Sequence, residues 1–180
     1  MASIYGGMGW HPSIPDARDY TYAASSPHIA SSVDLRSKCP PVYDQGQLGS
    51  CTANAIAGAF EYDLLLQGLA DFTPSRLFIY YNERVIEHSV HSDAGAEIRD
   101  GFKTIHKQGV CPETEWPYDI NKFDHKPSAH CYADAKHAKS IVYSRVNQDV
   151  NSIKGALTDG FPVTIGFTVY ESFESDATTN

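Results

Sequence analysis

The sequence has few of the features that mark several large classes of protein. Its 180 residues include only 14 Lys and Arg against 22 Asp and Glu, a net charge of −8, and the basic residues are scattered. Proteins that bind nucleic acid or anionic membranes normally need a Lys/Arg patch, so we expect neither partner. No apolar run approaches the roughly 20 residues that cross a bilayer, and the N-terminus lacks the pattern of a signal peptide. We expect a soluble protein of unknown compartment.

Closely spaced cysteine pairs are also absent. The four cysteines, Cys39, Cys51, Cys111 and Cys131, are separated by 12, 60 and 20 residues. Zinc sites in loops usually take their ligands in close pairs, so we expect no metal and no cofactor. If Cys51 is reactive, one disulfide can form among the other three cysteines, and the sequence does not choose which.

Three segments in the first part of the chain have a helical pattern. Apolar residues recur at helical spacing after Cys51 up to a stop at Gly68. "TPSRLFIYYNERVIE", residues 73–87, favours a helix because Thr73 followed by Pro74 is typical of a helix start. Residues 96–109, "AEIRDGFKTIHKQG", predict another helix that ends at Gly109. Residues 109–137 carry three prolines and no steady period.

The pattern changes towards the C-terminus. "SIVYSRV" and the alternating "FPVTIGFTV" predict strands, and "DVNSIKGALTDG" between them predicts a short helix. Helices first and strands later are typical of the α+β class. Residues 1–32 are rich in Gly and Pro, which favours an extended arm over a separate domain.

The stretch "DQGQLGSC", Asp44 to Cys51, places a thiol where the first helix begins. A helix N-terminus lowers the pKa of a thiol and favours the nucleophilic thiolate. The side-chain NH2 of Gln45 and the backbone N–H of Cys51 could together stabilise a developing oxyanion. The alternative is that Cys51 is a small buried residue that opens a core helix, as many free cysteines are.

Three stretches resemble the papain family of cysteine peptidases in the family's own order. "VDLRSKCPPVYDQGQLGSCTANAIAGAFEY" is similar to the start of the family's mature catalytic domain, where Asn/Asp-Gln-Gly leads to Gly-Ser-Cys and the central helix. "KQGVCPETEWPYD" and "GALTDGFPVTIGFTV" resemble two later segments, and together the matches cover Val33 to about Val169. Leu48 and Thr52 depart from the family signature. Because Leu48 replaces a usual disulfide partner, these departures indicate a divergent, bacterial-type branch with fewer disulfides.

The resemblance implies roles for seven residues. It makes Cys51 the nucleophile and Gln45 the oxyanion donor, with Gly49 on the cleft floor. It places Gly95 and Ala96 where the backbone pairs with an extended substrate, and Ile98 and Gly166 near the pocket for the side chain before the cleaved bond.

The resemblance also implies a fold and partners. The fold is papain-like, with a helical left domain over residues 33–137 and the incomplete start of an antiparallel β-barrel right domain over residues 138–180. The implied substrates are polypeptides, and protein or pro-segment inhibitors are implied partners. We interpret residues 1–32 as a minimal pro-segment that lies along the cleft or the back of the domain.

The catalytic base is not evident among the eight histidines. The family places its His and Asn about 130 to 150 residues after the cysteine, which corresponds to residues numbered about 181 to 201. His137 is nearest but precedes the first predicted strand, and His88 and His91 could share a metal but have no evident third ligand. We therefore expect a fragment of a peptidase, inactive by itself.

Two alternatives remain for the function. A non-catalytic homologue would use the cleft as a peptide-binding or inhibitory module. Another fold with a cysteine at a helix start, such as an amidase or a transglutaminase, would not explain the two downstream matches.

Overall fold

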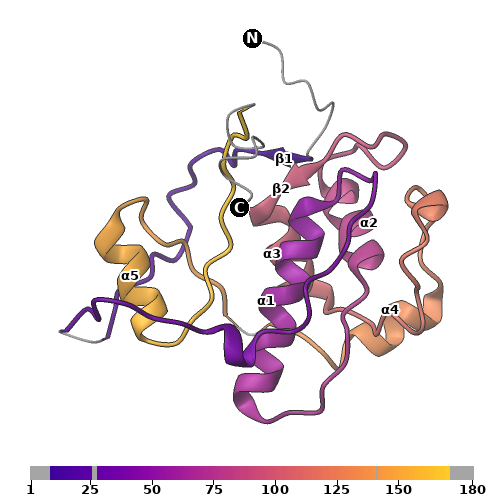
Figure 1. The fold of residues 1–180 in the computed structure, drawn as a ribbon. Helices are drawn as coiled ribbons and strands as arrows, with labels where there is room; N and C mark the ends of the chain where they lie inside the picture. Colours follow the sequence, from indigo (N-terminus) through magenta and orange to yellow (C-terminus); the bar gives the residue numbers. More distant parts are fainter. Residues whose placement is uncertain (1–8, 26–27, 141, 171–180) are drawn as a thin grey trace.

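The structure is a computed structural model that describes residues 9–25, 28–140 and 142–170. Its centre is a bundle of three helices, α1 (Cys51–Gln67), α2 (Arg76–Ile86) and α3 (Ile98–Gln108), which pack against one another (Figure 1). Around it lie short elements: β1 (Trp10–His11), η1 (Arg36–Lys38), β2 (Ala96–Glu97), η2 (Ile120–Lys122), α4 (Ala129–Ala135) and α5 (Val150–Thr158).

The three predicted helices of the bundle are confirmed, with one correction. α1 ends before Gly68 and α3 before Gly109, as the sequence predicts. The predicted start of α2 at Thr73 and Pro74 is wrong. Ser75 caps α2 through its side chain, which accepts a hydrogen bond from the amide of Phe78, while Pro74 forms a bridge with Pro112.

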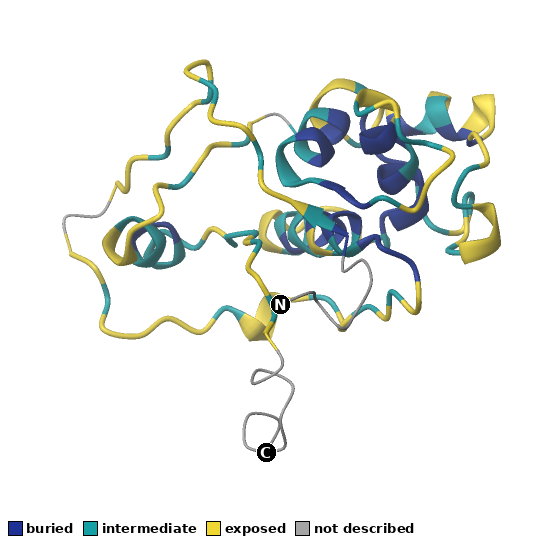
Figure 2. Ribbon diagram, turned by 90° about the horizontal axis from the view of Figure 1, so that it is seen from above, coloured by how far each residue is buried: buried dark blue, intermediate teal, exposed yellow. Residues whose placement is uncertain are grey.

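The hydrophobic core lies between these helices and the segment that follows them. The buried set is Leu48, Ala53, Ile56, Ala57, Leu77, Phe78, Ile79, Tyr80, Ile105, Val110, Cys111, Cys131 and Ala135. In Figure 2 the buried residues concentrate in this bundle, whereas the arm and the chain around α5 are mostly intermediate or exposed. The bundle therefore contains most of the buried core of the described residues.

The two predicted strands near the C-terminus are not formed. Within the described residues the strands are β1 and β2, which pair in parallel, with Trp10 opposite Ala96 and His11 opposite Glu97. Residues 161–170 are extended but in no sheet, and the earlier segment makes one isolated parallel bridge, Arg145 with Thr21. A strand needs a neighbour for its backbone groups, and these described segments have no such ladder. The predicted β-barrel domain is therefore not seen here.

Two further outcomes concern the second half of the chain. The predicted short helix is confirmed as α5, capped by Asp149, whose side chain accepts from Ser152. The interpretation of residues 109–137 as irregular missed α4. The sequence signal for α4 is Pro127 followed by Ser128. The Ser128 side chain caps the helix, since it accepts a hydrogen bond from the amide of Cys131.

The described residues between 9 and 32 contain β1 and no helix. This N-terminal arm runs from β1 past α5 before it reaches η1 and α1 (Figure 1), and residues 1–8 and 26–27 lie outside the described part. Among the described residues no helix is long and apolar enough to cross a membrane.

Candidate active site

Cys51 is the first residue of α1 and is partly buried. Burial raises the pKa of its thiol above the ordinary value of 9.0, and Glu83 adds to the rise when its carboxyl is ionised. The backbone amides of Thr52 and Cys51 act in the opposite direction, as expected at a helix start. The prediction of a lowered pKa is therefore wrong for these surroundings, because desolvation outweighs the helix terminus.

Gln45 lies in the same loop, and its side chain is already engaged. Its Nε2 donates a hydrogen bond to the carbonyl of Leu48 at 3.1 Å. An amide NH2 carries two hydrogens, so this bond orients the group and leaves one donor for another acceptor. The Gln45 side chain is partly buried, so water competes less for its hydrogen bonds.

The loop from Asp44 to Cys51 is held by two side chains from later parts of the chain. Arg76, at the start of α2, donates to the carbonyl of Asp44 at 2.9 Å and pairs with Glu113 at 2.8 Å. The hydroxyl of Tyr118 donates to the carbonyl of Gln45 at 3.0 Å, and the Arg76 guanidinium lies 3.9 Å from the Tyr118 ring centre. These contacts fix the loop on the bundle.

Asp93 links the two sides of the site and was missed by the sequence analysis. Its carboxylate oxygens both accept from the amide of Gly49 at 3.0 Å, and one also accepts from the hydroxyl of Tyr80. The amide of Gly95 in turn donates to the Tyr80 oxygen at 3.2 Å. The network therefore joins the loop of Cys51 to the segment that enters β2. In the sequence Asp93 was only an acidic residue two positions before Gly95.

The N-terminal arm passes between these two sides. The carbonyl of Gly9 accepts a hydrogen bond from the amide of Ala96 at 2.6 Å. A Cβ on Gly9 would overlap the backbone of Gly49, and a Cβ on Gly95 would overlap the backbone of Gly9. Both glycines have left-handed backbone angles, φ 78° and φ 80°. Only glycine fits so close an approach at these positions.

Trp10 continues this contact at the next residue. Its indole lies against Gly166, where a Cβ would overlap the ring. Ile98, the remaining residue of the predicted substrate-binding set, begins α3 directly after β2 and is partly buried. Gly49, Gly95, Ala96 and Gly166 belong to separate parts of the sequence, and the structure brings them together around Gly9 and Trp10.

A fully buried carboxyl lies beneath the start of α1. Glu83 on α2 accepts a hydrogen bond from the hydroxyl of Thr52 at 2.7 Å, and its second oxygen has no hydrogen-bond partner among the described residues. Burial raises the pKa of Glu83 well above its ordinary value of 4.5. The carboxyl next to the candidate nucleophile is therefore favoured in its neutral form.

The described structure supplies no imidazole for Cys51. All eight histidines are among the described residues, and none contributes to the pKa of the Cys51 thiol. His106 faces the carbonyl of Ser140, while His125 and His130 lie near Asp124 and Asp134.

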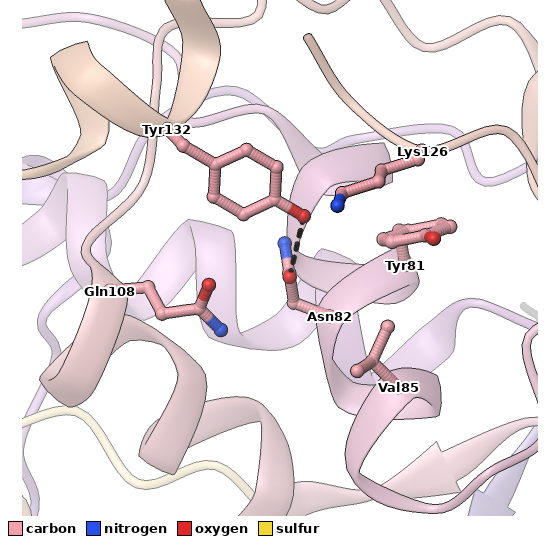
Figure 3. Close-up of a pocket in the computed structure, with 6 residues that line it drawn as sticks. All are labelled: Tyr81, Asn82, Val85, Gln108, Lys126 and Tyr132. Atoms are coloured by element: carbon pink, nitrogen blue, oxygen red, sulfur yellow. Dashed lines mark hydrogen bonds between the residues drawn. The ribbon is translucent and has the colours of Figure 1, made fainter. Parts of the chain in front are cut away.

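Two other features lie away from the predicted site residues. A cavity of about 350 Å³ is lined by Tyr81, Asn82, Val85, Gln108, Lys126 and Tyr132. Figure 3 shows the Tyr132 hydroxyl bonded to Asn82 in this cavity. Two donor sets have metal-like spacing, Cys111 with Glu115 and Cys131, and Glu115 with His130 and Asp134. Neither donor set includes His88 or His91.

Comparisons with known proteins place the chain in a family. Residues 29–178 match the family described as "papain family cysteine protease". A peptidase C1-like protein of Acanthamoeba polyphaga mimivirus, itself uncharacterised, is 50% identical over 145 residues, which is 76% of this chain and 47% of that protein. The chain belongs to the papain family of cysteine proteases. Its bacterial-type relationship is seen in xylellain, a cysteine protease from Xylella fastidiosa, which is 45% identical with a TM-score of 0.79.

The papain-like fold is also supported by a more distant structure. The digestive procathepsin L 3 of Tenebrio molitor is 25% identical, with a TM-score of 0.63 over 78% of this chain and 45% of that one. The xylellain match covers 87% of this chain and 64% of xylellain. This papain-family chain thus spans about half to two thirds of the relatives that it matches.

Proposed function

We propose that the chain is the nucleophile-bearing part of a cysteine peptidase that hydrolyses peptide bonds. Cys51 attacks the scissile carbonyl, while the free hydrogen of the Gln45 amide and the backbone N–H of Cys51 stabilise the oxyanion. The observation that carries this proposal is the hydrogen bond from Ala96 to Gly9. It supports the proposal that the backbone of β2 holds an extended peptide beside the loop of Cys51.

The proposed substrates are polypeptides bound in an extended form. Ala96 supplies the backbone contact, Gly49 and Gly95 leave room for a main chain, and Gly166 with Ile98 forms the pocket for a neighbouring side chain. In this proposal residues 33–137 form the helical domain, and residues 138–180 begin the β domain.

The proposed mechanism needs a His and an Asn that lie outside these 180 residues. An imidazole would take the proton of Cys51 and return it to the leaving amine, and an Asn would orient the ring. Within the described residues the backbone amides of Thr52 and Cys51 lower the pKa of the thiol, but burial outweighs them, so an imidazole would be needed to form the thiolate. The 180 residues by themselves should therefore show little or no peptidase activity.

A fluorogenic peptide tests this proposal in two forms of the protein. We expect turnover by the product of the natural reading frame, loss of that turnover in Cys51→Ala, and no effect of Cys39→Ala, which changes an exposed thiol. The 180-residue chain should not exceed the blank. Turnover that survives Cys51→Ala would refute the assignment of the nucleophile.

The raised pKa also favours one alternative, a peptide-binding or inhibitory homologue without catalysis. A thiol that stays protonated is a poor nucleophile, but the backbone contacts around Gly9 would still hold a peptide. If the full natural chain binds peptides and never turns them over, this alternative is correct.

We also propose that residues 1–32 act as a short inhibitory pro-segment. Besides the contacts of Gly9 and Trp10, Asp19 pairs with Arg99 at 2.6 Å, and both side chains are largely buried. Further along, the amide of Ser25 donates to Asp159 at 2.7 Å, and the amide of Ala30 donates to Thr158 at 3.2 Å. The arm is thus tied both to α3 and to the end of α5.

Displacement of the arm tests its role. Gly9→Leu should expel the arm from between Gly49 and Gly95, because the new side chain has no space. We expect modification of Cys51 by a thiol reagent to accelerate by about tenfold, which corresponds to about 1.4 kcal/mol of lost protection. Ala17→Leu, at an exposed arm position, is the matched control. Deletion of residues 1–32 with unchanged folding and thiol reactivity would count against the proposal.

A further inference from the structure

The structure separates the four cysteines into different environments. Cys39 is exposed, and Cys51 lies at the start of α1. Cys111 and Cys131 are 0% and 1% exposed, and their sulfur atoms lie within 4.8 Å of each other. Twenty positions apart in the sequence, these two residues meet in the core.

We propose that Cys111 and Cys131 form a disulfide that closes residues 112–130 into a cross-linked loop. Both residues are held by backbone contacts that do not depend on their thiols. The carbonyl of Cys111 accepts from the amide of Ser75 at the start of α2, at 2.9 Å, and the amide of Cys131 donates to the Ser128 side chain at the start of α4. Both thiols are free in the structure, and their sulfur atoms lie close enough that a small shift would bring them to bonding distance.

The cross-link forms by thiol–disulfide exchange with a small disulfide such as oxidised glutathione. One thiolate attacks the small disulfide and releases one glutathione thiol. The second thiolate then attacks the mixed disulfide and releases the other. Two electrons and two protons pass from the cysteines to two glutathione molecules. Burial raises the pKa of the Cys111 thiol, so the exchange takes place before the loop closes, during folding.

The loop that this cross-link closes reaches the candidate active site. It carries Tyr118, whose hydroxyl contacts both Ser50 and the carbonyl of Gln45. It also carries Trp116, whose carbonyl accepts from the Ser75 side chain at 2.7 Å. An effect of the cross-link on catalysis rests on the proposed function above, whereas the cross-link itself does not.

A metal ion is the competing occupant of this cluster. Glu115 offers a carboxylate oxygen beside the two sulfur atoms, and its Oε2 is buried with no hydrogen-bond partner among the described residues. The carboxyl of Asp134, however, lies within 4.8 Å of that of Glu115, and this second acidic group raises the pKa of Glu115. A cation would need a charged Glu115 and two thiolates in the core, so the described contacts favour the disulfide.

Alkylation and mass spectrometry test the cross-link in the natural chain. The protein is unfolded and refolded in a glutathione redox buffer without other reductant, then denatured in the presence of iodoacetamide and digested. We expect Cys39 and Cys51 to be alkylated and a peptide pair to link Cys111 with Cys131. Addition of reductant before denaturation should release both cysteines for alkylation.

Thermal unfolding provides the second measurement. Closure of a loop of about 20 residues predicts that reductant lowers the Tm by about 10 °C. Cys131→Ala should remove this sensitivity to reductant, while Cys39→Ala should keep it. If Cys131→Ala does not fold, the alkylation of the unsubstituted chain still decides the matter.

Three results would overturn the proposal. The first is alkylation of both Cys111 and Cys131 from the oxidising buffer. The second is a link from either residue to Cys39. The third is a zinc ion that copurifies at one per chain and whose removal by a chelator exposes both thiols.

Discussion

The bundle of α1, α2 and α3 and the chain after residue 138 show how differently helices and strands depend on their neighbours. The bundle buries Ile56, Phe78 and Ile105 almost completely, whereas Val142, Ile165 and Phe167 are between 52% and 72% exposed. A helix satisfies its own backbone groups, so the bundle needs only side-chain packing. A strand needs another strand, and the described part of residues 138–170 contains no sheet. Local sequence patterns therefore predict the helices of both regions, including α5, but not the pairing that strands need.

The largest predicted effect lies in the bundle. Ile56 is fully buried against α2 and α3, and Ile56→Ala should destabilise the fold by about 2–5 kcal/mol because it leaves a cavity. Urea unfolding followed by circular dichroism measures this loss. A loss below about 1 kcal/mol would mean that the bundle is not the stable region.

The next effect concerns the link between the two sides of the site. Asp93→Asn keeps the shape but weakens the hydrogen bonds from Gly49 and Tyr80, so we expect a loss of about 2 kcal/mol in unfolding free energy. Asp71→Asn, at an exposed position, is the control. If the two variants unfold alike, the Asp93 network does not stabilise the site.

The buried carboxyl of Glu83 predicts a pH dependence. Its pKa is raised in the folded protein, so the folded state holds a proton that the unfolded state loses above the ordinary pKa of 4.5. Stability should therefore fall as pH rises from 4.5 towards the folded pKa, by up to about 1.4 kcal/mol per pH unit for one proton. Glu83→Gln should flatten this dependence of stability on pH, because the glutamine does not titrate but can still accept the hydrogen bond from Thr52. An unchanged slope in Glu83→Gln would contradict this account.

The smallest effect is predicted for the second region. Ile165 is 62% exposed in an unpaired segment, so Ile165→Ala should change the stability of the 180-residue chain by less than about 0.5 kcal/mol. The same substitution should cost more in the product of the natural reading frame if further strands cover this segment. Equal and small losses in both forms would contradict the proposed β domain.

Some features of the candidate site depend on nearby residues in the sequence, and others depend on distant ones. Cys51 at a helix start and the end of α1 at Gly68 were predictable, because caps and periodicity are local. The roles of Gly95, Ala96 and Gly166 came only from the family resemblance, and they remain proposals. Asp93 could not be predicted, since its partners Gly49 and Tyr80 are 44 and 13 residues away. The pKa of Cys51 was predicted with the wrong sign because local pattern does not report burial.

The central claim is that Cys51 is the reactive thiol of a peptide-binding site covered by the arm. A peptidyl chloromethyl ketone, followed by mass spectrometry of the natural chain, tests this claim most directly. We predict one adduct, on Cys51, that forms faster in Gly9→Leu and is absent in Cys51→Ala. An adduct mainly on the exposed Cys39, or no difference between the parent chain and Gly9→Leu, would contradict the account.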